Sequence, residues 1–158
     1  MKVIFLDVDG VLNCIYSKSR QGNYIGIDDI RVKRLKEIVD KTGAKIVLTS
    51  TWKFDWEVTD KESMSEGGWY LDRKMKRQNL TILDKTHDQG WNRGYGIKQY
   101  LDSHIVDSWV VLDDEIFTDY ENEGILPHLV KTEFYDENGG IQDDHVKKAI
   151  MLLNEEEC

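Results

Sequence analysis

Polar side chains that could do chemistry follow three apolar runs of this sequence. The first run ends in two aspartates one residue apart and a glycine, the second in hydroxyl residues, and the third in adjacent aspartates. In chain order these residues are Asp7, Asp9 and Gly10, then Thr49, Ser50 and Thr51, then Asp113 and Asp114. Each group alone has an ordinary explanation, because Asp-Gly is a common turn and aspartates often cap helices. Together they indicate a single site, provided that the three runs are neighbouring strands.

Four carboxylates gathered at one place would repel one another and raise each other's pKa unless a cation lay between them. The sequence therefore predicts a metal site that uses Asp7, Asp9, Asp113 and Asp114. Oxygen donors without histidine or cysteine favour a hard cation, and Mg²⁺ is the usual choice where phosphate also binds. Hydroxyl and backbone N–H groups after the second run could then hold phosphate oxygens.

The elements that would position these residues alternate between strand and helix. Continuous apolar runs rich in β-branched residues are typical of strands that are buried on both faces. Strands are expected at 3–8, 44–50, 80–84, 108–114 and 128–132. Helices are expected over 66–79 and 94–104, between an N-cap at Asp28 or Asp29 and Gly43 just past the helix end, and after an N-cap at Asp143 or Asp144. The pattern predicts an α/β fold, a doubly wound (Rossmann-like) three-layer sandwich of about five parallel strands, whose ligands bind at the carboxyl ends of the strands.

Three stretches resemble, in order and spacing, motifs of the haloacid dehalogenase-like (HAD) superfamily. "FLDVDGVLN" is similar to its first motif, "IVLTSTW" to its second and "VVLDDE" to its fourth. The resemblance covers residues 3–114. "TSTW" and "RGYGIKQYL" further resemble a small, minimally capped branch, some of whose members are associated with nucleic-acid repair. Since the dehalogenase branch lacks the second acid of "DVD", the resemblance implies phosphatase or phosphotransfer chemistry.

The resemblance also implies a role for each matching residue. Asp7 would be the nucleophile that forms an aspartyl-phosphate, and Asp9 would be the general acid and base. The backbone carbonyl of Asp9 would bind the metal. The phosphate would contact Gly10, Ser50, Thr51 and Arg93. Gly10 would leave room for it, because a side chain there would intrude.

Two positions of the motifs stay open. The hydroxyl of the second motif is Ser50 or Thr49, and counting back from Trp52 favours Ser50. The third motif needs a cation near the start of the helix before the last motif, to neutralise nucleophile and phosphate. Arg93 fits this place better than Lys98, although most members of the superfamily carry lysine there.

The spacing leaves little room for a cap over the crevice. We expect one HAD-like domain over 1–158, with a flap at about 14–27 and a small insertion at about 53–79, and neither could form an independent cap domain. An open crevice suits a substrate with bulk of its own, such as a nucleic-acid end, or a small molecule enclosed by the insertion. A basic cluster in the insertion, defined as Arg73, Lys74, Lys76 and Arg77, either approaches this crevice or forms the solvated face of a helix.

Composition limits the alternatives. The 158 residues include 30 acidic and 21 basic ones, a net charge of -9 that argues against a generic nucleic-acid binder. No export signal or membrane span is evident, and Cys14 and Cys158 form no CxxC pair, so a cytoplasmic location is expected. The five tryptophans are expected to be packing residues.

We therefore expect a Mg²⁺-dependent phosphatase that acts through an aspartyl-phosphate on Asp7. Its partner would be a phosphorylated substrate, either a small molecule or a nucleic-acid end, and not a membrane. A polynucleotide end-processing phosphatase is the first alternative, with the same chemistry on a polymer. The second is a receiver-like phospho-acceptor or metal-binding signalling module without turnover, which also gathers acids, a hydroxyl and a lysine at strand ends. The phosphorylated aspartate of a receiver usually ends an inner strand, and a separate acidic pair ends the first strand, whereas here the first strand carries the Asp-x-Asp-Gly sequence.

Overall fold

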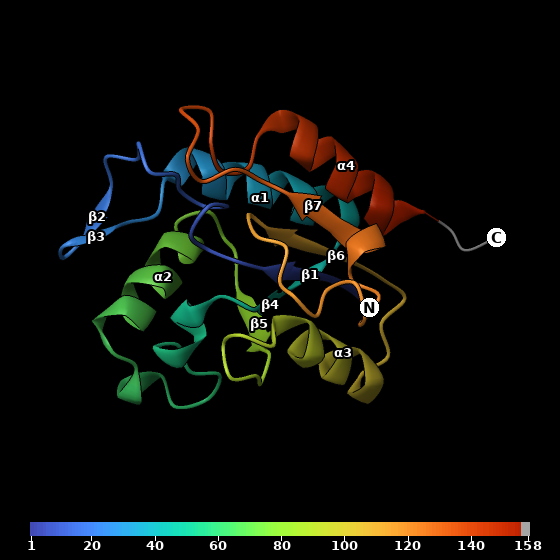
Figure 1. Ribbon diagram of the computed structural model, residues 1–158. Coiled ribbons are helices and arrows are strands. Elements are labelled where there is room, and N and C mark those ends of the chain that lie inside the picture. The colour runs from blue at the N-terminus through green and yellow to red at the C-terminus, as the bar shows by residue number, and fades with distance from the viewer. Residues whose placement is uncertain (156–158) are drawn as a thin grey trace.

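A sheet of five parallel strands forms the centre of the computed structural model, which describes residues 1–155 (Figure 1). The strand order is β5 (Ile82–Lys85), β4 (Lys45–Leu48), β1 (Lys2–Leu6), β6 (Ser108–Asp113) and β7 (Leu129–Lys131). The predicted α/β architecture is confirmed. β1 lies at the centre of the sheet, so the residues that follow it are flanked by the ends of β4 and β6.

Both faces of the central strands are buried, which explains their continuous apolar sequences. On one face, Ile4 and Leu6 pack under α1 (Asp29–Thr42), α2 (Glu66–Lys76) and α4 (Asp143–Asn154). On the other face, Val3 and Phe5 pack against α3 (Arg93–Ser103) and the segment that follows β6. Figure 1 shows α1 and α4 above the sheet and α3 below it. The three layers hold the carboxyl end of β1 at a single open edge.

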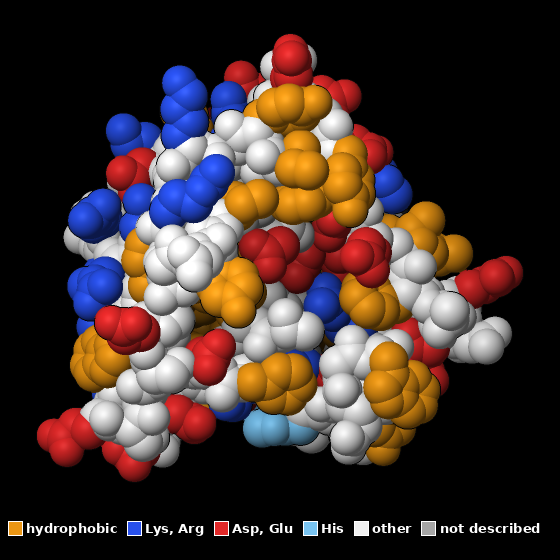
Figure 2. All heavy atoms as spheres, turned by 60° about the vertical axis from the view of Figure 1, so that its left-hand side comes forward, with side chains coloured by type: hydrophobic (Ala, Val, Ile, Leu, Met, Phe, Trp, Pro, Cys, Tyr) orange, Lys and Arg blue, Asp and Glu red, His pale blue; other side chains and the backbone are white. Residues whose placement is uncertain are grey.

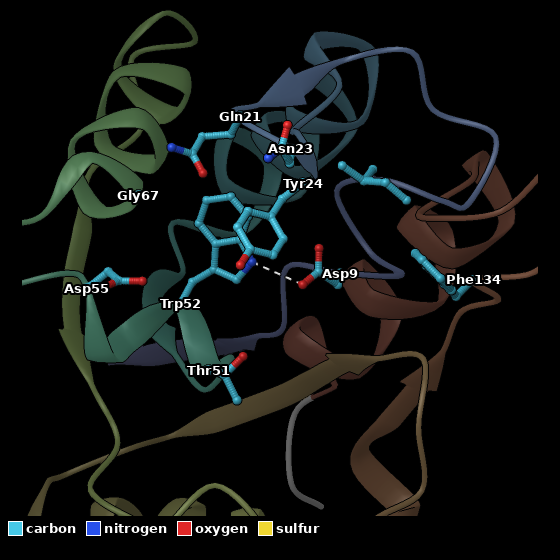
Figure 3. Close-up of a pocket in the computed structure, with 10 residues that line it drawn as sticks. Asp9, Gln21, Asn23, Tyr24, Thr51, Trp52, Asp55, Gly67 and Phe134 are labelled. Carbon is cyan, nitrogen blue, oxygen red and sulfur yellow. Dashed lines mark hydrogen bonds between the residues drawn. The ribbon is translucent and has the colours of Figure 1, made fainter.

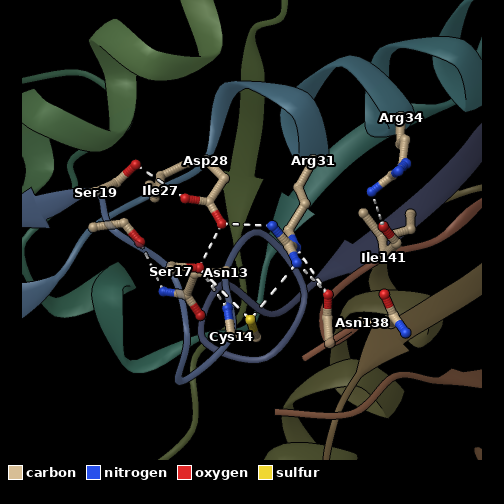
Figure 4. A network of polar contacts seen from close by, with 12 residues as sticks. Asn13, Cys14, Ser17, Ser19, Ile27, Asp28, Arg31, Arg34, Asn138 and Ile141 are labelled. Carbon is tan, nitrogen blue, oxygen red and sulfur yellow. Dashed lines mark hydrogen bonds and ion pairs between the residues drawn. The ribbon is translucent and has the colours of Figure 1, made fainter. Parts of the chain in front are cut away.

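Helix α1 begins after Asp28 and ends just before Gly43, as the sequence predicts. Gly43 has a φ of 72°, and its N–H donates to Val39 O at 2.8 Å. The Asp28 side chain does not bond to the helix N–H groups. Its carboxylate instead accepts bonds from Ser17, Ser19 and Arg31 (Figure 4). Asp28 therefore ties the start of α1 to the loop that precedes it.

Several expected boundaries shift. The residue before α4 is Gln142, not Asp143 or Asp144, and its N–H donates to His145 Nδ1 at 2.9 Å. The two aspartates lie in the first turn, where they favour the helix dipole. Helix α2 ends at Lys76 rather than 79, because the chain turns there and Asn79 takes a φ of 55°. Helix α3 starts at Arg93, one residue before the expected start.

The proposed flap at 14–27 contains a short antiparallel hairpin, which the sequence did not indicate. It consists of β2 (Arg20–Gln21) and β3 (Tyr24–Ile25). Single-turn helices η1 (Thr51–Phe54), η2 (Lys61–Ser63) and η3 (Leu126–His128) complete the elements. The insertion at 53–79 contains η2 and α2. Within residues 1–155, no helix is long and apolar enough to cross a membrane. Cys158 lies outside the described residues.

The packing role expected of all five tryptophans is wrong for two of them. Trp56 is fully buried, whereas Trp69 and Trp91 are exposed. Trp52 is half-buried beside the carboxyl end of β4. The position of Trp52 gives it a part in the site described next.

Candidate active site

The carboxyl ends of β1, β4 and β6 meet at one edge of the sheet. Asp7 N–H donates to Leu112 O of β6 at 2.9 Å, and Thr49 N–H donates to Leu6 O of β1 at 2.9 Å. These bonds extend the strand pairing just past the strand ends and place the polar residues side by side. A cavity of about 380 Å³ lies there. Its lining includes Asp7, Asp9, Ser50, Thr51, Arg93 and Asp114.

Three carboxylates cluster at this cavity, two of them in its lining and one buried behind it; we call it the phosphate cavity, after the ligand expected from the sequence. Asp7, Asp113 and Asp114 each bring a carboxylate oxygen within 4.8 Å of the others. Burial and the charges of Asp113 and Asp114 raise the pKa of Asp7 well above its ordinary value, although Arg93 opposes this. Burial also raises the pKa of Asp114 to about 6, with a contribution from the charge of Asp113. This donor set of crowded oxygens fits a hard divalent cation, which would relieve the repulsion.

The two adjacent aspartates of the predicted metal site differ in their surroundings. Asp113 is fully buried, and its Oδ2 accepts bonds from Arg93 Nη1 and Tyr120 Oη, both at 2.8 Å. Its Oδ1 accepts the N–H of Glu115 at 3.0 Å. Asp114 is half-buried and lines the cavity. Asp7 and Asp114 are therefore the carboxylates best placed to bind a metal, while Asp113 orients Arg93.

Arg93 is the cation that the structure brings to the acids. Its Nη1 lies 3.1 Å from Asp7 Oδ1, and its guanidinium carbon lies 4.2 Å from the centre of the Phe117 ring. Burial alone would lower the pKa of Arg93, but Asp7 and Asp113 outweigh it and raise the pKa above its ordinary value. Nε of Arg93 is buried with no hydrogen-bond partner among the described residues. A permanent charge with an unused donor thus lies beside the predicted nucleophile.

Lys98, the other candidate for the third motif, does not reach the cavity. It is exposed on α3 and pairs with Asp102, one turn further along the helix. A helix turns about 100° per residue, so five positions after Arg93 a side chain points about 140° away. Lys98 therefore faces solvent while Arg93 faces the acids.

The hydroxyl residues after β4 also separate. Ser50 lines the phosphate cavity, and its Oγ accepts the N–H of Trp52 at 3.2 Å. Thr51 is exposed and lines the same cavity. Thr49 is buried, and its Oγ1 has no hydrogen-bond partner in the described part of the chain. The structure therefore brings Ser50, and not Thr49, to the acids.

Asp9 lies at the rim of the cavity, where two side chains hold its carboxylate. Trp52 Nε1 donates to Oδ2 at 3.0 Å, and Asn13 Nδ2 donates to Oδ1 at 2.8 Å. The sequence reasoning missed both partners. Asn13 could have been noticed, because it ends the first motif. In the structure its own Oδ1 also accepts the N–H of Gly10 at 2.9 Å. Trp52 could not have been noticed as a partner of Asp9, because the two residues are 43 positions apart in the sequence and meet only in the fold.

Gly10 is required at its position for two reasons. Its φ of 86° lies in the left-handed region that favours glycine, and a Cβ there would clash with the Asp114 side chain. The Gly10 carbonyl accepts the hydroxyl of buried Thr132 at 2.5 Å. The sharp turn after β1 is thereby held against the segment that follows β7.

A buried ion pair next to the cavity was also missed. Lys53 is 2% exposed and pairs with Asp88, and its Nζ donates to Thr86 Oγ1 at 3.2 Å. Burial lowers the pKa of Lys53, although Asp88 opposes this. Asp88 Oδ2 accepts the N–H of Gly90, which lines the cavity, at 2.8 Å. The pair therefore joins the segment after β4 to the loop that leads into Arg93.

The basic cluster pairs mainly with nearby acids. Lys74 and Arg77 pair with Asp29 of α1 at 2.5 and 3.8 Å, and Lys76 pairs with Asp72 at 2.9 Å. No member of the cluster lines the phosphate cavity. Lys74, Lys76 and Arg77 therefore turn toward Asp72 and α1, and neither cavity at the strand ends is lined by a member of the cluster, which contradicts the idea that the cluster approaches the crevice.

On the face shown in Figure 2, acidic side chains gather around a hollow that hydrophobic side chains border. Over residues 3–146 the chain matches the profile of a family described as the HAD domain in Swiss Army Knife RNA repair proteins. The matched range includes every residue that lines the phosphate cavity. Searches of curated proteins and of solved structures find no match.

Proposed function

This chain belongs to the family of HAD domains found in Swiss Army Knife RNA repair proteins, and we propose that it is a Mg²⁺-dependent phosphatase of phosphomonoesters. The family is one of HAD-type hydrolases, and what we propose is that the bond this chain hydrolyses is that of a phosphomonoester. One observation carries it. The carboxylates of Asp7 and Asp114 and the guanidinium of Arg93 converge in a single cavity, with Asp9 at its rim. A carboxylate nucleophile needs such neutralising groups, because the phosphate it attacks is itself negative.

In the proposed reaction, a carboxylate oxygen of Asp7 attacks phosphorus and the bond to the leaving oxygen breaks. Asp9 gives its proton to that oxygen, so the product leaves as an alcohol. Asp9 then takes a proton from water, which attacks the same phosphorus and releases inorganic phosphate and the free Asp7 carboxylate. Arg93 and Ser50 would hold the phosphate oxygens through both steps. Mg²⁺ on Asp7 and Asp114 would supply positive charge to these oxygens.

Trp52 and Asn13 would serve this reaction by holding Asp9. Each donates a hydrogen bond to a different oxygen of its carboxylate. A general acid and base must stay within hydrogen-bond reach of the atoms it serves, and these two bonds limit its movement. Both donors are neutral, so they orient the carboxylate without adding a charge.

A second candidate is the same chemistry on a phosphorylated nucleic-acid end. The family description, which names RNA repair proteins, favours it. The open phosphate cavity also suits a substrate that is larger than the cavity itself. The net charge of -9 and the paired basic cluster disfavour long contacts with a phosphate backbone. A short contact with the terminal nucleotide is the form of this candidate that fits both observations.

Phosphate release from para-nitrophenyl phosphate and from 3′- and 5′-phosphorylated oligonucleotides tests the proposal. We expect turnover with Mg²⁺ and a fall to background after chelation, because the cavity acids repel one another without the cation. Absence of turnover on every phosphorylated substrate would contradict the phosphatase. A stable phosphoprotein without turnover would instead support the receiver-like alternative.

Replacement of Arg93 by methionine is expected to lower kcat by about 10²- to 10³-fold, since it removes the charge that neutralises nucleophile and phosphate. Arg93→Lys should recover part of this loss, because it keeps the charge but not the planar pair of donors. Lys98→Met is the matched control in the same helix and should leave kcat unchanged. Steady-state kinetics with circular dichroism to confirm folding measure all three. Equal loss in the Lys98 variant would overturn the assignment.

A further inference from the structure

A second cavity, of about 590 Å³, adjoins the phosphate cavity. Figure 3 shows the residues that line it. Asp9, Thr51 and Phe134 line both cavities, so the two are continuous at the predicted general acid. The walls of the second cavity come from the β2–β3 hairpin, the segment 51–55 and the start of α2. Its other lining residues are Gln21, Asn23, Tyr24, Ile25, Trp52, Asp55 and Gly67. The leaving group of a bound phosphate would therefore extend into this space.

Three aromatic side chains line the second cavity, namely Tyr24, Trp52 and Phe134, which is shared with the phosphate cavity. Tyr24 is 74% exposed, although a tyrosine of a packed hairpin would normally cover its ring. Trp52 is held by its Nε1 bond to Asp9 and lies against Tyr70, with ring centres 6.1 Å apart. Exposed aromatic faces of this kind bind flat, apolar ligand surfaces.

Polar groups without a positive charge complete the lining. Gln21 and Asn23 carry amides that both donate and accept, and the Asp55 carboxylate accepts. Among the described residues that line the two cavities, Arg93 is the one lysine or arginine. The second cavity is therefore poorly suited to another phosphate and well suited to a flat group with hydrogen-bonding edges.

The walls of this cavity are tied to one another. The N–H of Ile27 donates to Tyr70 Oη of α2 at 2.9 Å, which joins the end of the hairpin to the insertion. Asn13 Nδ2 donates to Gly26 O at 2.9 Å, and the same amide holds Asp9. A pocket with fixed walls loses less entropy when it binds a ligand than one that must first be ordered.

We propose that the second cavity binds the nucleobase next to the phosphate that is removed, with Tyr24 and Trp52 as its stacking surfaces. The proposal rests on the phosphatase function proposed above and names the leaving group that the site selects. A base presents both a flat face and a hydrogen-bonding edge, which match the aromatic rings and the amides. Stacking needs no basic surface, so it explains how a chain with a net charge of -9 recognises a nucleotide.

Adenosine 5′-monophosphate and ribose 5-phosphate test this directly, because they share the phosphate and the ribose, and a hydroxyl on C1 replaces the base in the second. We expect kcat/KM to be about tenfold higher for the nucleotide, since stacking of a base on aromatic side chains contributes at this level. Tyr24→Ala should remove most of that advantage by raising KM for the nucleotide, with little change for ribose 5-phosphate. Tyr16→Ala is the matched control, because Tyr16 is an exposed tyrosine of the same flap that lines a different hollow.

A binding measurement separates this proposal from the phosphatase itself. Adenosine 3′- and 5′-monophosphates are added to the Asp7→Asn protein with Mg²⁺, and tryptophan fluorescence reports stacking on Trp52. Saturable quenching that Tyr24→Ala weakens about tenfold supports the base site even if no substrate is turned over. Equal kcat/KM for nucleotide and ribose 5-phosphate, with no quenching, would overturn the base site and leave the phosphatase proposal standing.

Oligonucleotides of one to six residues with a single terminal phosphate show whether the site contacts only the terminal nucleotide or a longer stretch of the strand. If the pocket reads only the terminal nucleotide, KM should stay nearly constant with length and change little with added salt. A KM that falls steeply with length and rises steeply with salt would contradict a site limited to one base.

Discussion

Replacement of Asp7 by asparagine is expected to reduce phosphate release by at least about 10⁴-fold, because loss of a nucleophile removes the covalent path altogether. An amide nitrogen or oxygen does not form the acyl-phosphate. The asparagine side chain has nearly the same size, so the buried site should still fold. Steady-state turnover of para-nitrophenyl phosphate with Mg²⁺ measures the loss, and circular dichroism checks the fold.

The Asp7 variant also distinguishes the covalent path from direct attack by water. With a ³²P-labelled substrate, the wild-type protein should carry acid-stable, base-labile label after rapid quenching, and Asp7→Asn should carry none. Turnover by Asp7→Asn equal to that of the wild type would refute the assignment of the nucleophile. The loss should exceed that of Arg93→Met, because in the proposed reaction Arg93 assists a step that Asp7 performs.

Asp88→Ala is expected to lower the free energy of unfolding by about 3 to 5 kcal/mol, because it leaves Lys53 buried without its partner. Chemical denaturation measures this loss. The control is Asp102→Ala, which removes the exposed partner of Lys98 on α3 and should cost less than about 1 kcal/mol. Similar losses in the two variants would contradict a structural role for the buried pair.

A double variant tests the cause of this destabilisation. Lys53→Met combined with Asp88→Ala removes both charges and should restore much of the stability, because no unpaired charge stays buried. The double variant still lacks the hydrogen bond that the N–H of Gly90 donates to Asp88. We therefore expect stability to recover further than kcat, since the loop that carries Gly90 also leads into Arg93.

Local pattern was enough to predict the centre of this protein. The runs that became β1, β4 and β6 are apolar at successive positions because helices and loops cover both faces of the sheet. Parallel strands end at a common edge, so the polar residues after these three strands were certain to meet if the strands were neighbours. Asp7, Asp9 and Asp114 therefore lie together as expected, and the family match agrees with the motifs that contain them.

Only the tertiary structure decided which way individual side chains point and which residues that are distant in the sequence lie together. Whether Arg93 or Lys98 reaches the acids depends on the rotation of α3 against the sheet, and whether Ser50 or Thr49 does depends on which way the chain turns after β4. Lys53 and Asp88 are 35 residues apart, and the hairpin that carries Tyr24 meets Trp52 only across the crevice. Sequence periodicity reports which face of an element is buried, but it contains no record of which distant residue lies against that face.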